Sequence, residues 1–304
     1  MKAVVITEHG AKPEVAEVAT PQPGAGEVLV KVQASSINGF DTAVAAGYTA
    51  GLMEHRYPLV LGKDFAGTVE AVGAGVTRFA AGDKVFGVVT KAFLGDGGFG
   101  EFVTVPEDIG IAKLPEGVDI AVAGAVGLAG TAAVDALDAV KPQAGETVLI
   151  SGATGGVGAI AVQYAVAAGA RVIATAKPGE ESEFVRGLGA HEVVDHTGDL
   201  SAQVRATYPA GVDVVLHLAG DSAALVLLLT EQGRVASTRG PVDHPASTAV
   251  MATPTADTLG KLADDLAAGR LSVPVERTYR LDEVSAAFDD FAAGTLGKIS
   301  ITVA

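Results

Sequence analysis

One stretch constrains the fold of this chain more than any other: residues 146–177 read as a strand, a glycine loop, a helix and a second strand without interruption. Residues 147–151 form a short β-rich run, typical of a strand that is buried on both faces. After the loop, apolar residues recur at i, i+3, i+4 and i+7, the spacing of a helix with one buried side. Gly169 is placed to end that helix in a left-handed conformation, and residues 171–176 return as a strand. The sequence therefore predicts a β–α–β unit of a parallel sheet.

The loop inside this unit has the composition of a diphosphate-binding turn. Glycines let the main chain approach a pyrophosphate, and the N-terminus of the following helix offers free N–H groups and the positive end of a dipole. A glycine pattern alone marks a turn more often than a cofactor site, but here the strand before it and the helix after it supply the required context. We predict that a dinucleotide binds through Ala153, Thr154, Gly155, Gly156, Val157 and Gly158. Later parallel strands end at the same crevice, which extends the prediction to Ala219, Gly220, Arg239 and Gly240.

The residues after the second strand bear on which dinucleotide binds. Sites that prefer NAD usually place an acid about 20 residues beyond the loop, where it holds the ribose 2′-hydroxyl. At that point this chain has Ala176 and Lys177, and no carboxylate before Glu180 that would repel a 2′-phosphate. Lys177 can meet the phosphate as a point charge; the alternative is a solvated lysine that merely follows a strand. We predict NADPH as the cofactor, with NADH less favoured.

Composition excludes several classes of protein. The absence of cysteine rules out disulfides and thiolate metal sites. A formal net charge of −15 disfavours nucleic acid and anionic membranes as partners. Apolar runs such as residues 223–229 are too short to cross a bilayer, and the N-terminus lacks the apolar region of a signal peptide. We expect a cytoplasmic protein without nucleic-acid partners or membrane insertion.

The rest of the chain suggests two domains. Short β-rich runs separated by glycine and proline turns favour a partly open antiparallel barrel; they cover residues 2–7, 27–34, 66–72 and 84–89. An alanine-rich helix follows about residue 118, and strands then alternate with helices. Further strands are predicted at 192–195, 212–218 and 234–238, and helices at 223–231, 259–268 and 281–293. The last strand, 298–303, resembles the barrel strands, so we place residues 1–120 and 269–304 in one domain and 121–268 in a parallel-sheet nucleotide domain.

Several segments, in order along nearly the whole chain, resemble the medium-chain dehydrogenase/reductase superfamily, specifically its zinc-free quinone oxidoreductase branch. They are Ser36–Asp41, Gly62–Gly73, Gly82–Gly87, Gly98–Val103, Thr131, the loop Ala153–Gly158 and Gly297–Ile299. The resemblance implies a GroES-like barrel domain, a Rossmann domain, a cleft between them and a homodimer formed through the Rossmann domains.

The same comparison argues against a metal. The zinc alcohol dehydrogenases carry a cysteine where this chain has Asn38, and a His–Glu pair where it has Lys63 and Asp64. Zinc needs thiolate, imidazole or carboxylate ligands, and neither an amide nor an ammonium completes such a set. The six histidines are scattered without ligand spacing. We therefore expect no metal site.

Without a metal, a quinone or α,β-unsaturated carbonyl is the easier hydride acceptor, because the substrate itself delocalises the developing charge. By match to the family motifs, the candidate catalytic residues are Asn38, Asp41, Tyr48, Lys63 and Asp64. Each has a structural alternative: a turn for Asn38, main-chain hydrogen bonds for the two aspartates, an ion pair with one of them for Lys63, and packing for Tyr48. Asn38 and Thr131 are expected near the nicotinamide, and His196 near the adenosine ribose. A helix N-cap and a surface histidine are the alternatives for the last two.

Two other functions remain open. An enoyl-thioester or alkenal reductase of the same superfamily would use the same hydride chemistry on another acceptor. A cofactor-binding structural or regulatory protein is the non-enzymatic alternative, and turnover of NADPH with an acceptor separates the two classes. A short-chain dehydrogenase does not fit, because Tyr164, Tyr208 and Tyr279 all lack a lysine four residues later.

Overall fold

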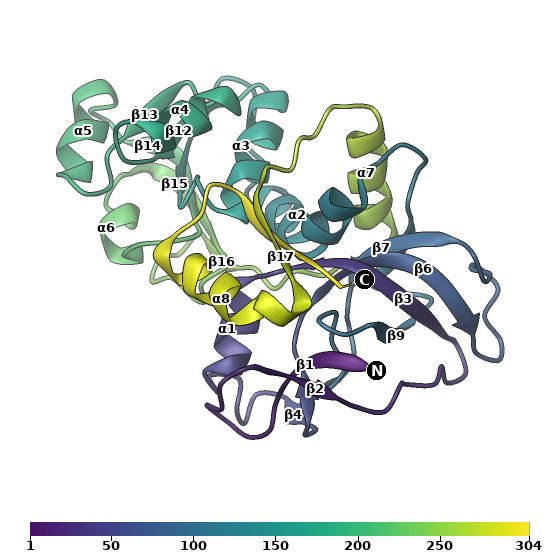
Figure 1. The fold of residues 1–304 in the computed structure, drawn as a ribbon. Helices are drawn as coiled ribbons and strands as arrows, with labels where there is room; N and C mark the ends of the chain where they lie inside the picture. The colour runs from purple at the N-terminus through teal and green to yellow at the C-terminus, as the bar shows by residue number, and fades with distance from the viewer. Residues whose placement is uncertain (304) are drawn as a thin grey trace. The chain divides into compact units, whose positions relative to one another are not determined.

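The computed structural model describes residues 1–303 and divides them into two compact units (Figure 1). One unit contains Met1–Ala129 together with the chain from Pro254 onward, and the other contains Gly130–Thr253. Helix α2 (Ile120–Val140) contributes residues to both units. We refer to them as the barrel unit and the nucleotide unit.

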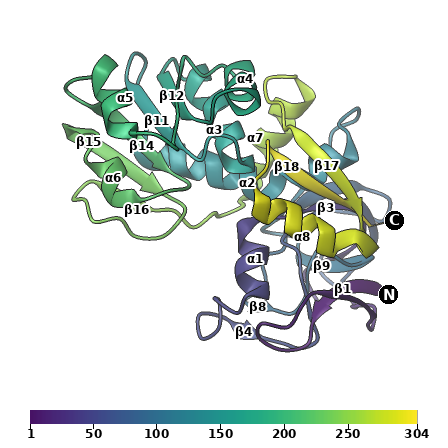
Figure 2. The ribbon, with the colours of Figure 1, turned by 60° about the vertical axis from the view of Figure 1, so that its left-hand side comes forward.

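The nucleotide unit is built on a six-stranded parallel sheet with the order β13-β12-β11-β14-β15-β16. Its strands are β11 (Thr147–Ser151), β12 (Arg171–Thr175), β13 (Glu192–Val194), β14 (Val212–His217), β15 (Leu229–Ser237) and β16 (Ser247–Ala249). The flanking helices are α3 (Gly156–Ala167), α4 (Glu180–Gly187), α5 (Leu200–Thr207) and α6 (Ser222–Val226) (Figure 2). Numbered by position in the chain the order is 3-2-1-4-5-6, that of a Rossmann domain. The predicted fold class is confirmed.

Strand β11 lies in the middle of the sheet, and its apolar residues suit that position. Val148, Leu149 and Ile150 are fully buried between β12 and β14, as expected for a parallel strand covered on both faces. From β11 the sheet continues to β12 and β13 on one side and to β14, β15 and β16 on the other. In folds of this kind, a crevice forms at such a switch point, beyond the carboxyl ends of the strands. The glycine loop begins at that end of β11.

One predicted helix was too long. The helix expected over residues 223–231 is α6, which ends at Val226, and β15 already begins at Leu229. Leu229 pairs with Val212 and Arg234 with Val214, with an irregularity between the two pairs. The residues taken for the last helical turn therefore form the irregular start of a strand, where pairing with β14 prevails over local helix preference.

The barrel unit holds a larger mixed sheet, a smaller antiparallel sheet and a short parallel strand pair. The larger sheet has the order β10-β7-β6-β3-β18-β17, with β9 also paired to β3; the smaller has the order β2-β1-β5. The strands are β1 (Lys2–Ile6), β2 (Glu14–Glu17), β3 (Glu27–Ser36), β4 (Glu54–His55), β5 (Leu59–Val60), β6 (Asp64–Val72), β7 (Lys84–Val88), β8 (Phe93–Leu94), β9 (Phe102–Pro106), β10 (Ile111–Lys113), β17 (Val275–Arg280) and β18 (Lys298–Thr302). Its other elements are α1 (Gly39–Ala45), α7 (Ala256–Ala267), the 3₁₀ helix η1 (Leu281–Glu283) and α8 (Val284–Ala293).

The C-terminal strand completes the sheet of the barrel unit. β18 pairs antiparallel with β3, with Ser300 opposite Ser36, and parallel with β17. Helix α7 packs on β10 and so belongs to the barrel unit. The compact units thus differ from the predicted limits, which assigned residues 121–129 and 254–268 to the nucleotide domain. The domain limits themselves stay a prediction.

Helix α2 corrects the expectation that no segment reaches membrane-spanning length. By length and composition alone it is long and apolar enough to cross a bilayer. In the most apolar stretch of 18 residues in this helix, 67% is buried inside the protein. Such burial is typical of the core helix of a globular protein.

Candidate functional site

The glycine loop after β11 combines tight packing with one open position. Gly152 has a φ of +77°, and a Cβ there would lie 2.9 Å from the Cβ of Ala219. A Cβ on Gly158 would lie 2.2 Å from the carbonyl oxygen of Gly152. Gly155, the N-cap of α3, has nothing nearer than 3.7 Å to such a Cβ. Two glycines therefore close the turn against its surroundings, while the third leaves the main chain open to a phosphate.

Two residues that hold this loop were missed. The N–H of Gly152 donates to Thr175 Oγ1 at the end of β12, over 3.0 Å. For Gly152 the available sequence signal was its place directly before the predicted loop. For Thr175 it was a polar residue at the end of a predicted strand; the structure shows that Thr175 is buried. The predicted residues Thr154, Gly155, Gly156 and Val157 are partly exposed, whereas Ala153 and Gly158 are buried.

The neighbouring strand ends close in on the loop. The hydroxyl of Ser151 donates to the carbonyl of Ala219, which brings the turn after β14 next to the turn after β11. His217 lies 2.9 Å from Ser237 Oγ through Nδ1 and 3.1 Å from the carbonyl oxygen of Gly220 through Nε2. The structure thus brings Ala219 and Gly220 to the loop. Arg239 and Gly240 follow the end of β15, where the Arg239 N–H donates to Ser237 Oγ over 3.1 Å.

The end of β12 carries the predicted Lys177 beside an acid. Ala176 is buried, and Lys177 is exposed. The Lys177 ammonium lies 3.6 Å from the carboxylate of Glu181, which also accepts from the Lys177 N–H over 2.8 Å. His196 lies 3.7 Å from the same carboxylate. No carboxylate precedes Glu180, as the sequence shows, but the first turn of α4 brings Glu181 back to Lys177, the residue predicted to meet the 2′-phosphate.

Two other predicted residues lie in unexpected surroundings. Thr131 is fully buried in the middle of α2, so the N-cap alternative for it was wrong. Tyr48 is 79% exposed after the end of α1, so packing does not explain it either. Contact of either residue with a ligand stays a prediction.

The barrel unit contains a buried polar cluster, formed by Ser36, Asn38, Asp41, Asp64 and Lys298. One oxygen of the Asp64 carboxylate accepts from Ser36 Oγ over 2.5 Å and from Asn38 Nδ2 over 2.8 Å. Its other oxygen accepts from the Leu128 N–H over 2.7 Å. Asn38 Oδ1 accepts from the Lys298 ammonium over 2.6 Å, and that ammonium lies 3.6 Å from Asp64. The end of β3 and the starts of β6 and β18 thus bring opposite charges together with almost no exposure to water.

Lys298 was missed as a site residue, although the Gly297–Ile299 segment was recognised as a family motif. It is 4% exposed, and burial lowers the pKa of its ammonium, an effect that Asp64 and Asp41 oppose. The available sequence signal was a lysine at the start of the predicted strand 298–303. A lysine that is buried in a strand needs a polar or charged partner. Lys63 does not form the expected pair: its ammonium donates to the carbonyl of Val89, and Lys298 pairs with Asp64 instead. Burial lowers the pKa of Lys63 as well.

Asp41 is buried at the start of α1, where its carboxylate accepts from the Asn38 N–H over 2.9 Å. Burial raises its pKa to about 7, and the nearby Asp64 adds to the rise. In the unfolded chain the group titrates near its ordinary value of 3.8, so between these values the folded state binds more protons. Stability should therefore fall as pH rises from 5 to 7.

We expect Asp41 to contribute about 2 kcal/mol to that fall. Asp41→Asn keeps an oxygen for the Asn38 N–H and removes the titration. Urea unfolding of both proteins at several values between pH 5 and 8 measures the difference. A slope that is equally steep in Asp41→Asn would assign the pH dependence to other groups.

The cluster does not fit a zinc ion. Both oxygens of Asp64 already accept hydrogen bonds, and the amide of Asn38 is engaged at its oxygen and its nitrogen. A buried ammonium already lies within 3.6 Å of the carboxylate, where a second cation would be repelled. Across residues 1–303, no three side chains of His, Cys, Asp or Glu gather in a way that could hold a metal.

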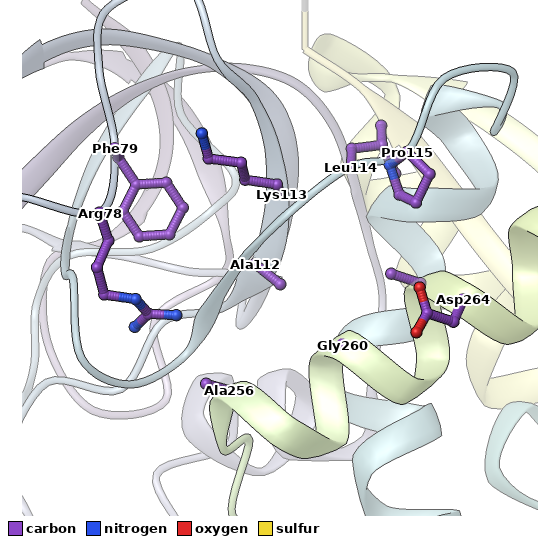
Figure 3. A pocket seen from close by; sticks show the side chains of 10 residues that line it. Arg78, Phe79, Ala112, Lys113, Leu114, Pro115, Ala256, Gly260 and Asp264 are labelled. Carbon is purple, nitrogen blue, oxygen red and sulfur yellow. The ribbon is translucent and has the colours of Figure 1, made fainter.

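A separate hollow of about 580 Å³ lies in the barrel unit between α7 and β10 (Figure 3). Its cationic side chains are engaged elsewhere: Arg78 donates to the carbonyl of Glu107, and Lys113 pairs with Asp83 at 2.9 Å. Small residues of α7, Ala256 and Gly260, form the opposite wall. We assign no role to this hollow.

Comparison with known proteins agrees with both units. Residues 24–116 match the family model described as the alcohol dehydrogenase GroES-like domain, and residues 156–255 match the one described as zinc-binding dehydrogenase. The quinone oxidoreductase of Lama guanicoe is 33% identical over 326 residues, which cover 98% of this chain and 96% of the relative. A mycocerosic acid synthase-like polyketide synthase of Mycolicibacterium smegmatis is 41% identical over 198 residues, covering 64% of this chain and 9% of that one.

Solved structures lead to the same class. The quinone oxidoreductase of Coxiella burnetii superposes with a TM-score of 0.89 at 25% identity, over 100% of this chain and 99% of that one. A mycobacterial protein in complex with NADPH has a TM-score of 0.86 at 29% identity, over 100% of both chains. A GroES-like unit and a Rossmann unit in one chain define a dehydrogenase-type oxidoreductase, which is an enzyme. The chain belongs to the medium-chain dehydrogenase/reductase superfamily, in its quinone oxidoreductase branch.

Proposed function

We propose that this enzyme transfers hydride from NADPH to a quinone or an α,β-unsaturated carbonyl compound without a metal. The observation that carries the proposal is the closed cluster of Asn38, Asp64 and Lys298, whose polar atoms are already paired with one another and with the main chain; no other ligand set for zinc is found among residues 1–303. An alcohol–carbonyl conversion develops an alkoxide charge that needs strong stabilisation. A quinone or enone spreads that charge over its own conjugated system.

The glycine loop, Lys177 and His196 are the residues that we propose bind the cofactor. The main-chain N–H groups at the start of α3 would hold the diphosphate, and Lys177 with His196 would face the 2′-phosphate. When bound, the nicotinamide supplies the hydride. Asp64 and Lys298 engage both ends of the Asn38 amide, and we therefore propose a positioning role for Asn38 at the start of α1. We propose that the proton comes from solvent or a nearby hydroxyl group.

Family kinship supports two further proposals. We propose a homodimer formed through the Rossmann domains and a cytoplasmic location. Size-exclusion chromatography with light scattering measures the mass of the protein in solution, and the mass of a single chain would contradict the proposed dimer.

The second candidate is an enoyl-thioester or alkenal reductase. The 41% identity with part of a polyketide synthase favours it. Both candidates are tested by following cofactor absorbance with NADPH or NADH and a panel of quinones, alkenals and enoyl thioesters. Fastest turnover with quinones supports the first proposal, and fastest turnover with enoyl thioesters supports the second. Cofactor binding without turnover of any acceptor would contradict both.

Reversing the charge of Lys177 should separate the two cofactors. We expect Lys177→Glu to weaken NADPH binding at least about tenfold, because an attraction to the 2′-phosphate becomes a repulsion. NADH lacks that phosphate and should lose about twofold or less. Fluorescence titration of each cofactor measures the dissociation constants, and equal losses for both would remove Lys177 from the proposed site.

A further inference from the structure

The 2′ end of the proposed cofactor site contains an acid beside Lys177 and His196. Glu181 lies in the first turn of α4 and has a side chain that is 26% exposed. Its carboxylate accepts from the Lys177 N–H over 2.8 Å and lies 3.6 Å from the Lys177 ammonium and 3.7 Å from His196 Nε2. One carboxylate therefore engages both residues that are proposed to face the 2′-phosphate.

We infer that Glu181 sets cofactor specificity by competing with the 2′-phosphate of NADPH for Lys177 and His196; this inference rests on the proposed function. A phosphate that approaches Lys177 must displace the carboxylate or lie beside it. Displacement breaks an existing ion pair, and coexistence brings two anions together. NADH carries a hydroxyl at the same position and can donate a hydrogen bond to a carboxylate. Glu181 thus lowers the advantage that Lys177 gives to NADPH and lets the enzyme use NADH as well.

Other charges near Lys177 do not account for this competition. Asp195 also attracts Lys177 and His196, but among residues 1–303 it has no hydrogen bond or ion pair with either of them, and its carboxylate instead accepts from the N–H and the hydroxyl of Thr197. Glu180 and Glu183 share the first turn of α4. Neither has a hydrogen bond or ion pair with Lys177 or His196 in the described part of the chain, residues 1–303.

A purely structural role for Glu181 would have a different signature. An acid in the first turn of a helix stabilises it through the helix dipole, and that effect is independent of the cofactor. Glu181→Gln removes the charge and keeps an oxygen for the Lys177 N–H. Glu183→Gln removes the same charge from the same turn and serves as the matched control.

The test is titration of the full-length protein with NADPH and NADH at physiological salt. We expect Glu181→Gln to tighten NADPH binding about threefold to fivefold and to change NADH binding by about twofold at most. In Glu183→Gln both constants should stay within about twofold of the parent. In the double variant Lys177→Met/Glu181→Gln the gain for NADPH should disappear.

The outcomes separate the inference from the proposed function. Unchanged NADPH binding in Glu181→Gln, or an equal gain for both cofactors, would overturn the inference while dinucleotide binding stands. The same gain in Glu183→Gln would also overturn it, because net charge alone would then explain the result. If the unsubstituted protein bound neither dinucleotide, the proposed function would fall, and the inference with it.

Discussion

Lys298→Met should lower the free energy of unfolding by about 3–5 kcal/mol, the cost of leaving one partner of a buried ion pair alone. The Lys298 ammonium is 4% exposed and donates to Asn38 Oδ1 and to the carbonyl of Ile37. Its removal leaves the fully buried carboxylate of Asp64 without the nearest cation. Urea unfolding at pH 8 measures the loss.

A second substitution tests the cause of that loss. In Lys298→Met/Asp64→Asn the uncompensated charge is gone, and we expect the double variant to regain a substantial part of the stability. Asn at position 64 keeps an oxygen that can accept from the Leu128 N–H. If the two losses simply added, the ion pair would not be the source of the stability, and packing of the lysine stem would explain the effect.

Two alanine substitutions in the glycine loop should differ in their effect on stability. Gly158→Ala places a Cβ 2.2 Å from the carbonyl oxygen of Gly152 and 2.6 Å from the Cα of Ala153. Because backbone lies on that side, we expect a loss of about 3 kcal/mol or more in stability, together with loss of dinucleotide binding. Gly155→Ala meets nothing within 3.7 Å and should change stability by about 1 kcal/mol or less.

The informative variant is Gly155→Ala, because it keeps the fold and fills the open face of the turn. We expect it to weaken the binding of NADPH and of NADH equally, by about tenfold, since the added methyl group stands where we propose that the diphosphate approaches the main chain. Thermal unfolding and fluorescence titration measure the two effects separately. Wild-type affinity in Gly155→Ala would mean that the diphosphate does not lie against this turn.

The cluster around Asp64 supports the proposal that this chain works without zinc, although residues 156–255 match the family model described as zinc-binding dehydrogenase. Where a metal would place two positive charges beside a carboxylate, this protein places the ammonium of Lys298. The cation comes from the last strand, so the barrel unit is complete only when β18 has paired with β3. The polar cluster and the closure of the sheet therefore depend on each other.

Local sequence predicted the elements whose pattern is self-contained. The limits of β11, α3 and β12 lie within one or two residues of the predicted ones. A buried strand, a glycine turn and an amphipathic helix each have a sequence pattern that can be recognised locally. The prediction failed where long-range pairing prevails over local preference. Residues 229–231 look helical in isolation, but pairing with β14 makes them strand.

For the polar residues of the site too, local sequence predicted some of the residues but not their distant partners. Asn38, Asp41 and Asp64 were found from motif position, yet their partners Lys298 and Leu128 are 260 and 64 residues distant from Asn38 and Asp64 respectively. Glu181 is only four residues from Lys177, but the chain order did not show that α4 turns its side chain back to the strand end.

By itself, the sequence determined the strand, glycine loop and helix of a Rossmann unit and the residue types at positions 38, 63 and 64 on which the zinc-free proposal rests, because both depend on residue type and short spacing. Only the tertiary structure decided which charges meet: Lys298 with Asp64, and Glu181 with Lys177 and His196. Charge pairing depends on distance in space, and strands and helices remote in sequence set that distance.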